Sequence, residues 1–363
     1  MPRTIVATKA TDGASGAVSQ VEQDSLYEYS AYGMHLTSAL RFPELGASHP
    51  SGAVSSMQWR LDVSSEPPGQ LEDSRQLGEA EYAGGVRISL SRNHTTWELS
   101  TSDAGVWTFE PHEGRMHWHR DNVAGDAKGR FDALGRVMPL MLHATGALVL
   151  HGSSVATKHG GIALLGPKGR GKSTLAVACA DAGAALAGDD VAVLRGGEQP
   201  MLYPSVGFAR LHADSATELG RDANGAGTWG SEKMLVPAGS FERRLTSAVP
   251  LRAIYFLEAA PADVSVVRRE RVTGAAATVT MLTQATNALL LGGEEQLQLM
   301  QRVSEFLAKV PVFVLHVPRS MKFLGAAAEE LLRWIGEDGG DADVAEPAPL
   351  GSVGRRNVSS LPR

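Results

Sequence analysis

The sequence predicts an α/β protein in which a small β-rich domain precedes a larger domain of alternating strands and helices. Three observations predict it. Short segments that alternate apolar and polar residues fill the N-terminal part, strands and helices alternate after it, and a glycine-rich loop joins an apolar strand to a helix. The chain has 363 residues, which favours two domains over one.

The expected organisation has four parts. Residues 1–24 are polar, rich in Gly, Ser, Thr and Ala, and are expected to form a disordered lead. Residues 25–125 are expected to form the β-rich N-terminal domain, because MQWRLDV, GVRISLS, TTWELST and GVWTFEP read as half-buried antiparallel strands. Residues 126–336 are expected to form the second domain, and residues 337–363 a disordered tail.

The second domain begins with a segment of helical spacing and then alternates. One apolar face of the first helix is made of Leu134, Val137, Met138 and Met141. ALVLH and GGIALLG follow as strands, KSTLAVACADAG as a helix with Gly183 at its end, and AALAGDDVAVL as a strand interrupted by two aspartates. LRAIYFLEA and VPVFVLHVP are expected strands, and EQLQLMQRVSEFLAKV and AAAEELLRWIG are expected helices.

Composition excludes several classes of function. The net charge is −6, the pI is near 6.0, and no run of Lys or Arg occurs, so a nucleic-acid partner is not expected. Cys179 is the single cysteine, which rules out an internal disulfide framework and a multi-cysteine zinc site. No apolar run approaches ~18 residues, so we expect no membrane association and a cytoplasmic protein.

The segment GPKGRGKS fits the phosphate-loop pattern G-x-x-x-x-G-K-[ST], with a strand before it and a helix after it. Its glycines let backbone N–H groups approach phosphate oxygens, and the helix N-terminus adds partial positive charge. Lys172 is placed to reach the β- and γ-phosphates, and the Ser173 hydroxyl to bind Mg²⁺. The loop therefore predicts ATP and Mg²⁺ as cofactors. The nucleotide-binding residues are Gly166, Pro167, Lys168, Gly169, Arg170, Gly171, Lys172, Ser173 and Thr174, although Lys168 and Arg170 also fit solvent-facing positions.

Two adjacent aspartates, Asp189 and Asp190, follow soon after the loop in LAGDDVAVL. Neighbouring residues of a regular strand point to opposite faces, so both could reach one phosphate only if the chain bends, which we expect at Gly188. Two acids beside a metal-bound triphosphate suit phosphoryl transfer to an alcohol. A strand-end turn with two solvated carboxylates is the alternative.

His151, in LVLHGSSV, ends the strand that precedes the strand of the loop. If the two strands were parallel neighbours, their ends would share one side of the sheet and the imidazole would face the phosphate site. A lone histidine is otherwise more often an ordinary strand-end residue.

Together LHGSSV, GPKGRGKST and GDDV, in this order, resemble the HPr serine kinase family, whose P-loop core is related to phosphoenolpyruvate carboxykinases. The resemblance implies that Asp189 is the catalytic base toward a serine hydroxyl, that His151 is its partner, and that Asp190 and Ser173 bind metal. Lys172 and the loop would hold the phosphates. The glycine-rich signature that follows the aspartates in HPr kinase/phosphorylases is missing.

The segment YSAYGMHLTSALRFPEL is similar to the start of shorter HPr-kinase-like proteins found with ribosomally made peptides, which include lasso-peptide tailoring kinases. The resemblance implies a serine of a precursor peptide as the acceptor, in place of HPr. Arg210 and Lys233 look like positions where those relatives carry basic residues near the γ-phosphate, and both also fit ordinary surface charges.

Two further sets of residues have an ordinary and a functional interpretation. His117 and His119 share one face of an expected strand and could bind metal, but without a third ligand nearby an ordinary strand face is favoured. Trp97, Trp107 and Trp118 could form a platform for an acceptor peptide or fill the core of the small domain.

The expected function is an ATP- and Mg²⁺-dependent kinase that phosphorylates a serine of a peptide or small protein. One alternative is a small-molecule or sugar-alcohol kinase, which a closed pocket beside the loop would favour. Another is a non-catalytic ATP-binding regulatory module. The resemblance also makes a homo-oligomer plausible.

Overall fold

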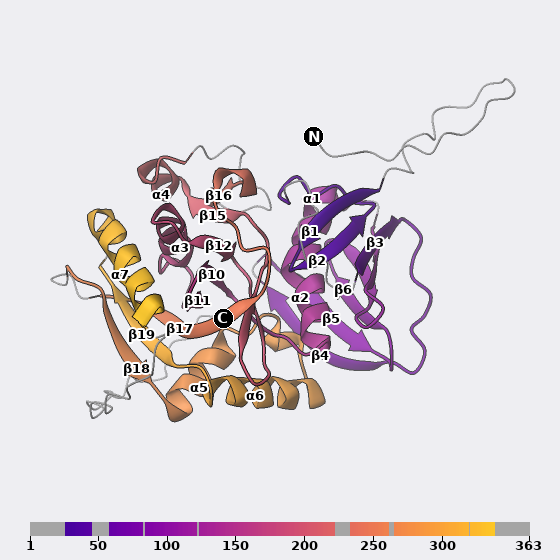
Figure 1. The fold of residues 1–363 in the computed structure, drawn as a ribbon. Coiled ribbons are helices and arrows are strands. Elements are labelled where there is room, and N and C mark those ends of the chain that lie inside the picture. Colours follow the sequence, from indigo (N-terminus) through magenta and orange to yellow (C-terminus); the bar gives the residue numbers. More distant parts are fainter. Residues whose placement is uncertain are drawn as a thin grey trace, which may run out of the picture.

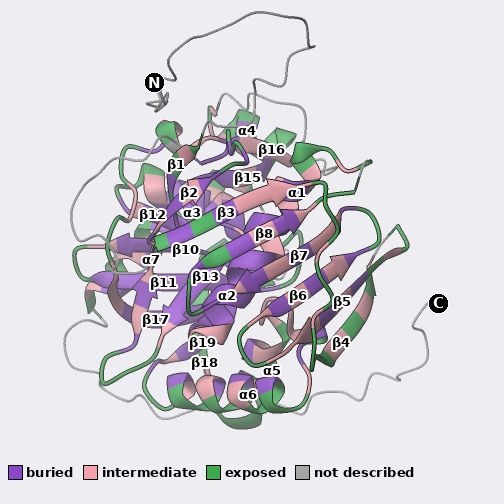
Figure 2. Cartoon of the chain, turned by 90° about the vertical axis from the view of Figure 1, so that its right-hand side faces the viewer, coloured by how far each residue is buried: buried purple, intermediate pink, exposed green. Residues whose placement is uncertain are grey.

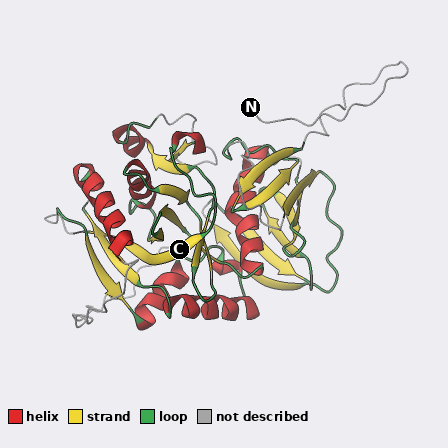
Figure 3. Cartoon of the chain, in the orientation of Figure 1, coloured by secondary structure: helices red, strands yellow, loops and turns green. Residues whose placement is uncertain are grey.

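The computed structural model describes residues 26–45, 58–82, 84–121, 123–221, 233–260, 265–318 and 320–337. In these residues the protein is a mixed α/β structure with two large sheets set side by side (Figures 1 and 3). The expected lead lies outside the described residues. So does the expected tail, except Glu337, which is the last residue of helix α7.

The first sheet contains eight strands within the described residues, in the order β1-β2-β3-β8-β7-β6-β5-β4. The strands are β1 (Tyr27–Ala31), β2 (Met34–Ser38), β3 (Gln58–Ser64), β4 (Arg75–Tyr82), β5 (Val86–Arg92), β6 (Trp97–Thr101), β7 (Gly105–Glu110) and β8 (Arg115–His119). The expectation of purely antiparallel strands is wrong, because β3 lies parallel to both β2 and β8. Strands β4 to β8 are antiparallel, each to the next. The last of them, β8, lies beside β3 and runs in the same direction.

The tryptophans of this sheet fill its core. Trp107 and Trp118 are fully buried and stack at a centroid distance of 5.5 Å. Trp97 is 4% exposed and packs on Phe109. None of these rings is available to a peptide, which confirms the core interpretation.

The second sheet contains nine strands within the described residues, in the order β12-β10-β11-β17-β14-β13-β9, and β19 and β18 extend it beside β17. The strands are β9 (Leu148–Leu150), β10 (Gly152–Thr157), β11 (Gly160–Leu165), β12 (Ala185–Gly188), β13 (Ala192–Arg195), β14 (Met201–Tyr203), β17 (Val249–Ala259), β18 (Arg268–Val272) and β19 (Val312–Val317). Strands β15 (Ala209–His212) and β16 (Lys233–Val236) form a separate antiparallel pair.

Helices cover both faces of the second sheet (Figure 1). Apolar residues of α3 and α7 pack in one core cluster with β10, β11 and β17, and those of α5 and α6 belong to the cluster on the other face. The longer helices are α3 (Lys172–Asp181), α5 (Gly274–Thr283), α6 (Glu294–Leu307) and α7 (Leu324–Glu337), and the shorter α4 spans Ala213–Glu218. The expected helices and most expected strands of this part of the chain are confirmed. AALAGDDVAVL differs, because its halves form two separate strands, β12 beside β10 and β13 between β14 and β9.

A broken helix lies between the two sheets and joins their cores. It consists of α1 (Asp126–Asp132), a π-helical turn η1 (Ala133–Val137) and α2 (Met138–Ala144). All four residues of the predicted apolar face are buried, and the Tyr32 hydroxyl of the first sheet donates a 2.5 Å hydrogen bond to the Leu134 carbonyl. Buried residues of both sheets and of this helix belong to one core cluster, while exposed residues mark β4, α4 and α6 (Figure 2). The two sheets therefore share one core.

His143 in α2 makes the stability of this core dependent on pH. Its ring is 5% exposed, and Nδ1 lies 3.2 Å from Arg302 Nη1. Burial, and then the charge of Arg302, lower the pKa of His143 to about 4. Because this folded-state pKa lies below the unfolded value, the unfolded chain binds the proton first as the pH falls. The neutral, buried His143 ring therefore contributes about 3 kcal/mol to the free energy of unfolding above pH ~6.5, and this contribution is lost progressively toward pH ~4.

We therefore expect the free energy of unfolding, measured in urea between pH 7 and pH 4, to fall less steeply in His143→Gln than in the wild type. His159→Gln, at an exposed histidine, is the matched control and should follow the wild type. Identical pH dependence in His143→Gln and the wild type would contradict the assignment.

Candidate active site

The glycine-rich loop, residues 166–171, lies between β11 and α3, at the edge where β11 and its parallel neighbour β17 end. Gly166, Gly169 and Gly171 all have positive φ angles, of 134°, 80° and 84°. A Cβ atom at Gly166 would lie 2.8 Å from the Leu257 carbonyl oxygen, so only glycine fits between the loop and β17. Residues 167–171 are exposed, as a phosphate-binding loop requires.

Lys172 and Ser173 open helix α3 and are each only 8% exposed. The Lys172 ammonium donates hydrogen bonds to the carbonyl oxygens of Gly166, at 2.7 Å, and Pro167, at 3.2 Å. Burial, and then the charge of Lys233, lower the pKa of Lys172, while the two aspartates oppose this shift. The ammonium thus folds back over the loop, where phosphate oxygens can compete for its donors.

His151 reaches the loop by a different route from the one expected. Strand β10, which follows His151 directly, is antiparallel to β11 and pairs Gly152 with Leu165. The expectation that parallel strands bring His151 to the loop is wrong. Antiparallel pairing places the start of β10 beside the end of β11, so His151 still lies next to the loop.

Asp189 is deeply buried at the end of β12, with 1% of its surface exposed. Its Oδ1 accepts a 2.5 Å hydrogen bond from the Ser153 hydroxyl, and its Oδ2 accepts one of 2.8 Å from the Arg210 backbone N–H. Burial, and then the negative charge of Asp190, raise the pKa of Asp189, although both hydrogen bonds act in the opposite direction. The group is thus held in one orientation by two donors.

Asp190 differs from its neighbour in conformation and in exposure. Its φ angle is 63°, in the left-handed region, so the chain turns at Asp190 itself. The bend was expected two residues earlier, at Gly188, which does not have a positive φ angle. Its Oδ2 accepts a 2.8 Å bond from Arg210 Nη1, and its side chain is 24% exposed. Burial alone would raise the pKa of Asp190, but the charges of Arg210 and Lys233 outweigh it and lower the pKa.

The imidazole of His151 contacts the second aspartate of the pair. Its Nδ1 lies 3.0 Å from the Asp190 backbone oxygen and donates to it, which leaves Nε2 as the acceptor of the neutral ring. Burial, and then the charge of Lys172, lower the pKa of His151, and the aspartates raise it. No hydrogen bond joins His151 to the Asp189 carboxylate among those of the described residues.

Arg210 and Lys233 come from the β15–β16 pair, which lies over the aspartates. Arg210 binds Asp190 and is 14% exposed, so it is not an ordinary surface charge. Lys233 begins β16 opposite His212, two residues after Arg210 in β15, and its charge lowers the pKa values of Lys172, Asp189 and Asp190. The tertiary structure thus brings together the loop, the two aspartates, His151 and both basic residues.

Two further residues at the site were not singled out in the sequence. Ser153 is two positions after His151 in LHGSSV, and its position on the same face of the chain could have indicated it. Gln284 lies far along the chain, yet its Oε1 accepts a 3.3 Å bond from the Gly166 N–H. No local pattern in TQATN signals that contact.

The histidine pair of β8 is an ordinary strand face. The rings of His117 and His119 stack at 4.1 Å, and their nitrogens contact Ser64, Thr108 and the Glu66 carbonyl. Within the described ranges, no group of three or more His, Cys, Asp or Glu side chains could hold a metal ion. Cys179 is buried in α3, and burial raises the pKa of its thiol to about 12.

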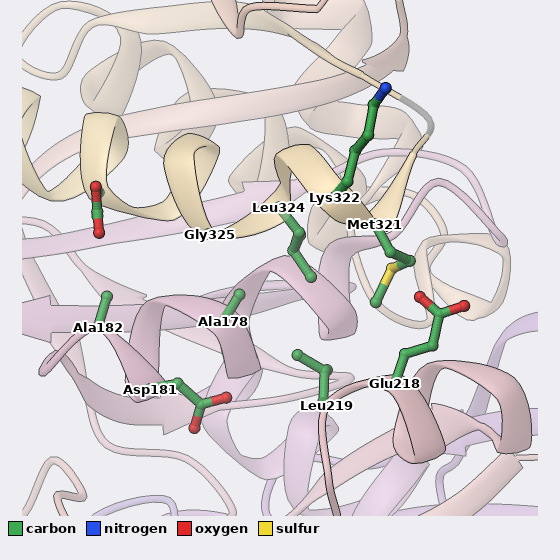
Figure 4. A pocket seen from close by; sticks show the side chains of 10 residues that line it. Ala178, Asp181, Ala182, Glu218, Leu219, Met321, Lys322, Leu324 and Gly325 are labelled. Atoms are coloured by element: carbon green, nitrogen blue, oxygen red, sulfur yellow. The ribbon is translucent and has the colours of Figure 1, made fainter.

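A cavity of about 490 Å³ lies at the other end of α3 from the loop (Figure 4). Helix α3 is about 15 Å long, so this cavity is remote from the aspartates. Asp181 at its rim is paired with Arg221, and Glu218 comes from α4. The lining residues are Ala178, Asp181, Ala182, Glu218, Leu219, Met321, Lys322, Leu324, Gly325 and Glu329.

Comparisons with known proteins add little to this geometry. No family model and no curated protein matches the chain. Among solved structures it is similar to the HPr(Ser) kinase/phosphatase from Coxiella burnetii, with 14% identity and a TM-score of 0.31, over 51% of this chain and 93% of that one. A superposition with so low a TM-score carries no inference about activity, which must come from the site itself. In the part of the chain that the structure describes, no helix is long and apolar enough to cross a membrane.

Proposed function

We propose that this protein is an ATP- and Mg²⁺-dependent kinase that transfers the γ-phosphate to a serine hydroxyl of a peptide. The observation that carries the proposal is the position of two aspartates in different environments beside a phosphate loop. Asp189 is buried and doubly hydrogen-bonded, whereas Asp190 is partly exposed and paired with Arg210. Pairs of acids whose environments separate their pKa values are typical of acid–base chemistry.

In the proposed reaction the acceptor hydroxyl oxygen attacks the γ-phosphorus, the bond to the β,γ-bridging oxygen breaks, and ADP leaves. The hydroxyl proton passes to Asp189, whose raised pKa makes it a better proton acceptor than an ordinary carboxylate. His151 holds the backbone of Asp190 and so supports the turn that carries both acids. Lys172, Arg210 and Lys233 supply positive charge for the transferring phosphoryl group.

The residues present fit a magnesium ion bound with the nucleotide. The Ser173 hydroxyl and the Asp190 carboxylate are hard oxygen ligands, and Mg²⁺ commonly uses one or two such groups together with phosphate oxygens. When bound, the ion would neutralise charge on the β- and γ-phosphates. Asp190 keeps the ionised form that this role requires, because the charges of Arg210 and Lys233 lower its pKa.

The acceptor proposed is a serine of a ribosomally made precursor peptide, of the lasso type. The support is the similarity of YSAYGMHLTSALRFPEL to the start of the shorter HPr-kinase-like proteins that include the tailoring kinases. A closed pocket beside the aspartates would favour a small-molecule acceptor in place of a peptide.

The test is transfer of labelled γ-phosphate from ATP and Mg²⁺ to a panel of peptides that carry a serine near the C-terminus, with serine-to-alanine peptides as controls. Label on the serine peptides alone would support the proposal. Label on sugar alcohols or other small alcohols in place of peptides would favour the small-molecule kinase. ATP binding without transfer to any acceptor would favour a regulatory module.

A further inference from the structure

Gln284, the residue at the C-terminal end of α5, contacts both halves of the candidate site. Its backbone oxygen accepts a 2.6 Å hydrogen bond from the His151 N–H. Its side-chain Oε1 accepts the 3.3 Å bond from the Gly166 N–H, at the first position of the phosphate loop. No other residue, among the hydrogen bonds of the described ranges, joins the His151 backbone to the loop.

The backbone around Gln284 is fixed by further bonds to the strand that leads to His151. The Thr286 N–H donates a 2.9 Å bond to the Val149 carbonyl, and Ala285 forms an isolated bridge with Leu150. The segment after α5 therefore runs alongside β9 and is joined to it by these contacts. This arrangement fixes the main chain of Gln284 and aims its side chain at the loop.

The first sheet contacts the chain that follows this segment, at Leu290 and at Glu295 of α6. A Cβ atom at Gly78 in β4 would lie 2.7 Å from the Leu290 carbonyl oxygen, so the two backbones are in close contact. Arg92 of β5 pairs with Glu295 at 2.8 Å, and the Glu295 side chain is 3% exposed. The chain that follows Gln284 is thus held by the first sheet.

Gly166 needs this support more than an ordinary loop residue does. Its φ angle of 134° is accessible only to glycine, whose backbone is the least restricted of all residues, and it is buried against β17. A buried N–H that loses its acceptor must move toward another one, and movement here would displace the loop that follows.

We propose that Gln284 is a positioning residue. By bonding both the His151 N–H and the Gly166 N–H, it fixes the start of the phosphate loop relative to His151 and holds the loop in the conformation that binds the nucleotide. The inference rests on the proposed function, since it assumes that the loop binds ATP. Gln284 acts through Gly166 and does not take part in the transfer. Its effect is therefore on nucleotide affinity, and the chemical step keeps its rate.

The test compares Gln284→Met, which keeps the length of the side chain and removes the acceptor, with the wild type. The dissociation constant and the KM for ATP should rise about three- to tenfold, the effect of losing one neutral hydrogen bond. The kcat should stay within about twofold, and the Tm should fall by no more than about 4 °C, the shift that the loss of one hydrogen bond produces. Gln284→Asn keeps an amide that is too short to reach Gly166, and it should behave as the methionine variant does.

Gln301→Met is the matched control, because Gln301 is an exposed glutamine on α6. Its ATP affinity should equal that of the wild type. Unchanged affinity in Gln284→Met, equal changes in Gln301→Met, or a lower kcat at unchanged affinity would each overturn the inference. A wild-type protein that binds no ATP would instead overturn the proposed function, and direct measurement of ATP binding separates the two results.

Discussion

Asp189→Asn should lower the rate of phosphate transfer by about 10²–10⁴-fold, the contribution of a general base, and leave ATP binding unchanged. The variant keeps the shape of the side chain and an oxygen that can accept the Arg210 N–H, so the site should remain folded. The amide cannot accept the proton of the acceptor hydroxyl. Transfer rates with a serine peptide, beside the dissociation constant for ATP and the Tm, check this expectation.

Asp190→Asn is the informative comparison for the same experiment. We expect it to weaken the Mg²⁺ dependence of transfer, because it removes a charged oxygen ligand that pairs with Arg210. Asp190 is the more exposed of the two acids, so an acceptor hydroxyl could reach it more easily than Asp189. The comparison therefore tests which of the two aspartates is the base. If Asp190→Asn abolished transfer at saturating Mg²⁺ while Asp189→Asn kept the wild-type rate, the base would be Asp190 and Asp189 would serve to hold the turn.

Lys172→Met should lower transfer by about 10²–10³-fold, the effect of removing a single donor that stabilises developing charge, and should also weaken ATP binding. The Lys172 side chain is buried under the loop, and methionine fills a similar volume without the ammonium. The Gly166 and Pro167 carbonyls lose a donor in the variant, but both belong to a loop that is largely exposed. Kinetics with varied ATP and a fixed peptide concentration separate the two effects.

Lys168→Met serves as the control in the same loop, because Lys168 is exposed and makes no hydrogen bond among those of the described residues. It should change transfer by less than about threefold, as expected for a solvent-screened charge. Equal losses in the two lysine variants would indicate that the net charge of the loop, and not the buried ammonium, determines nucleotide binding.

An element could be predicted from the sequence where the residues that specify it are close together in the chain. The strand, loop and helix around GPKGRGKS were readable because apolar runs, glycines and a Lys-Ser pair lie within one short segment. The parallel pairs of β3 were not readable, because the partner strands β2 and β8 are chosen by distant parts of the chain. His151 was placed near the loop for the wrong reason, since strand direction is a tertiary property.

The sequence by itself determined the mixed α/β character, the position of the glycine-rich loop and the pair of acids after it, because neighbouring residues carry each of these signals. Only the tertiary structure decided that Ser153 binds Asp189, that Arg210 binds Asp190 and that Gln284 reaches Gly166. These contacts join residues from separate strands and loops. Packing of the two sheets on one shared core brings them together, and no local pattern of residues encodes such distances.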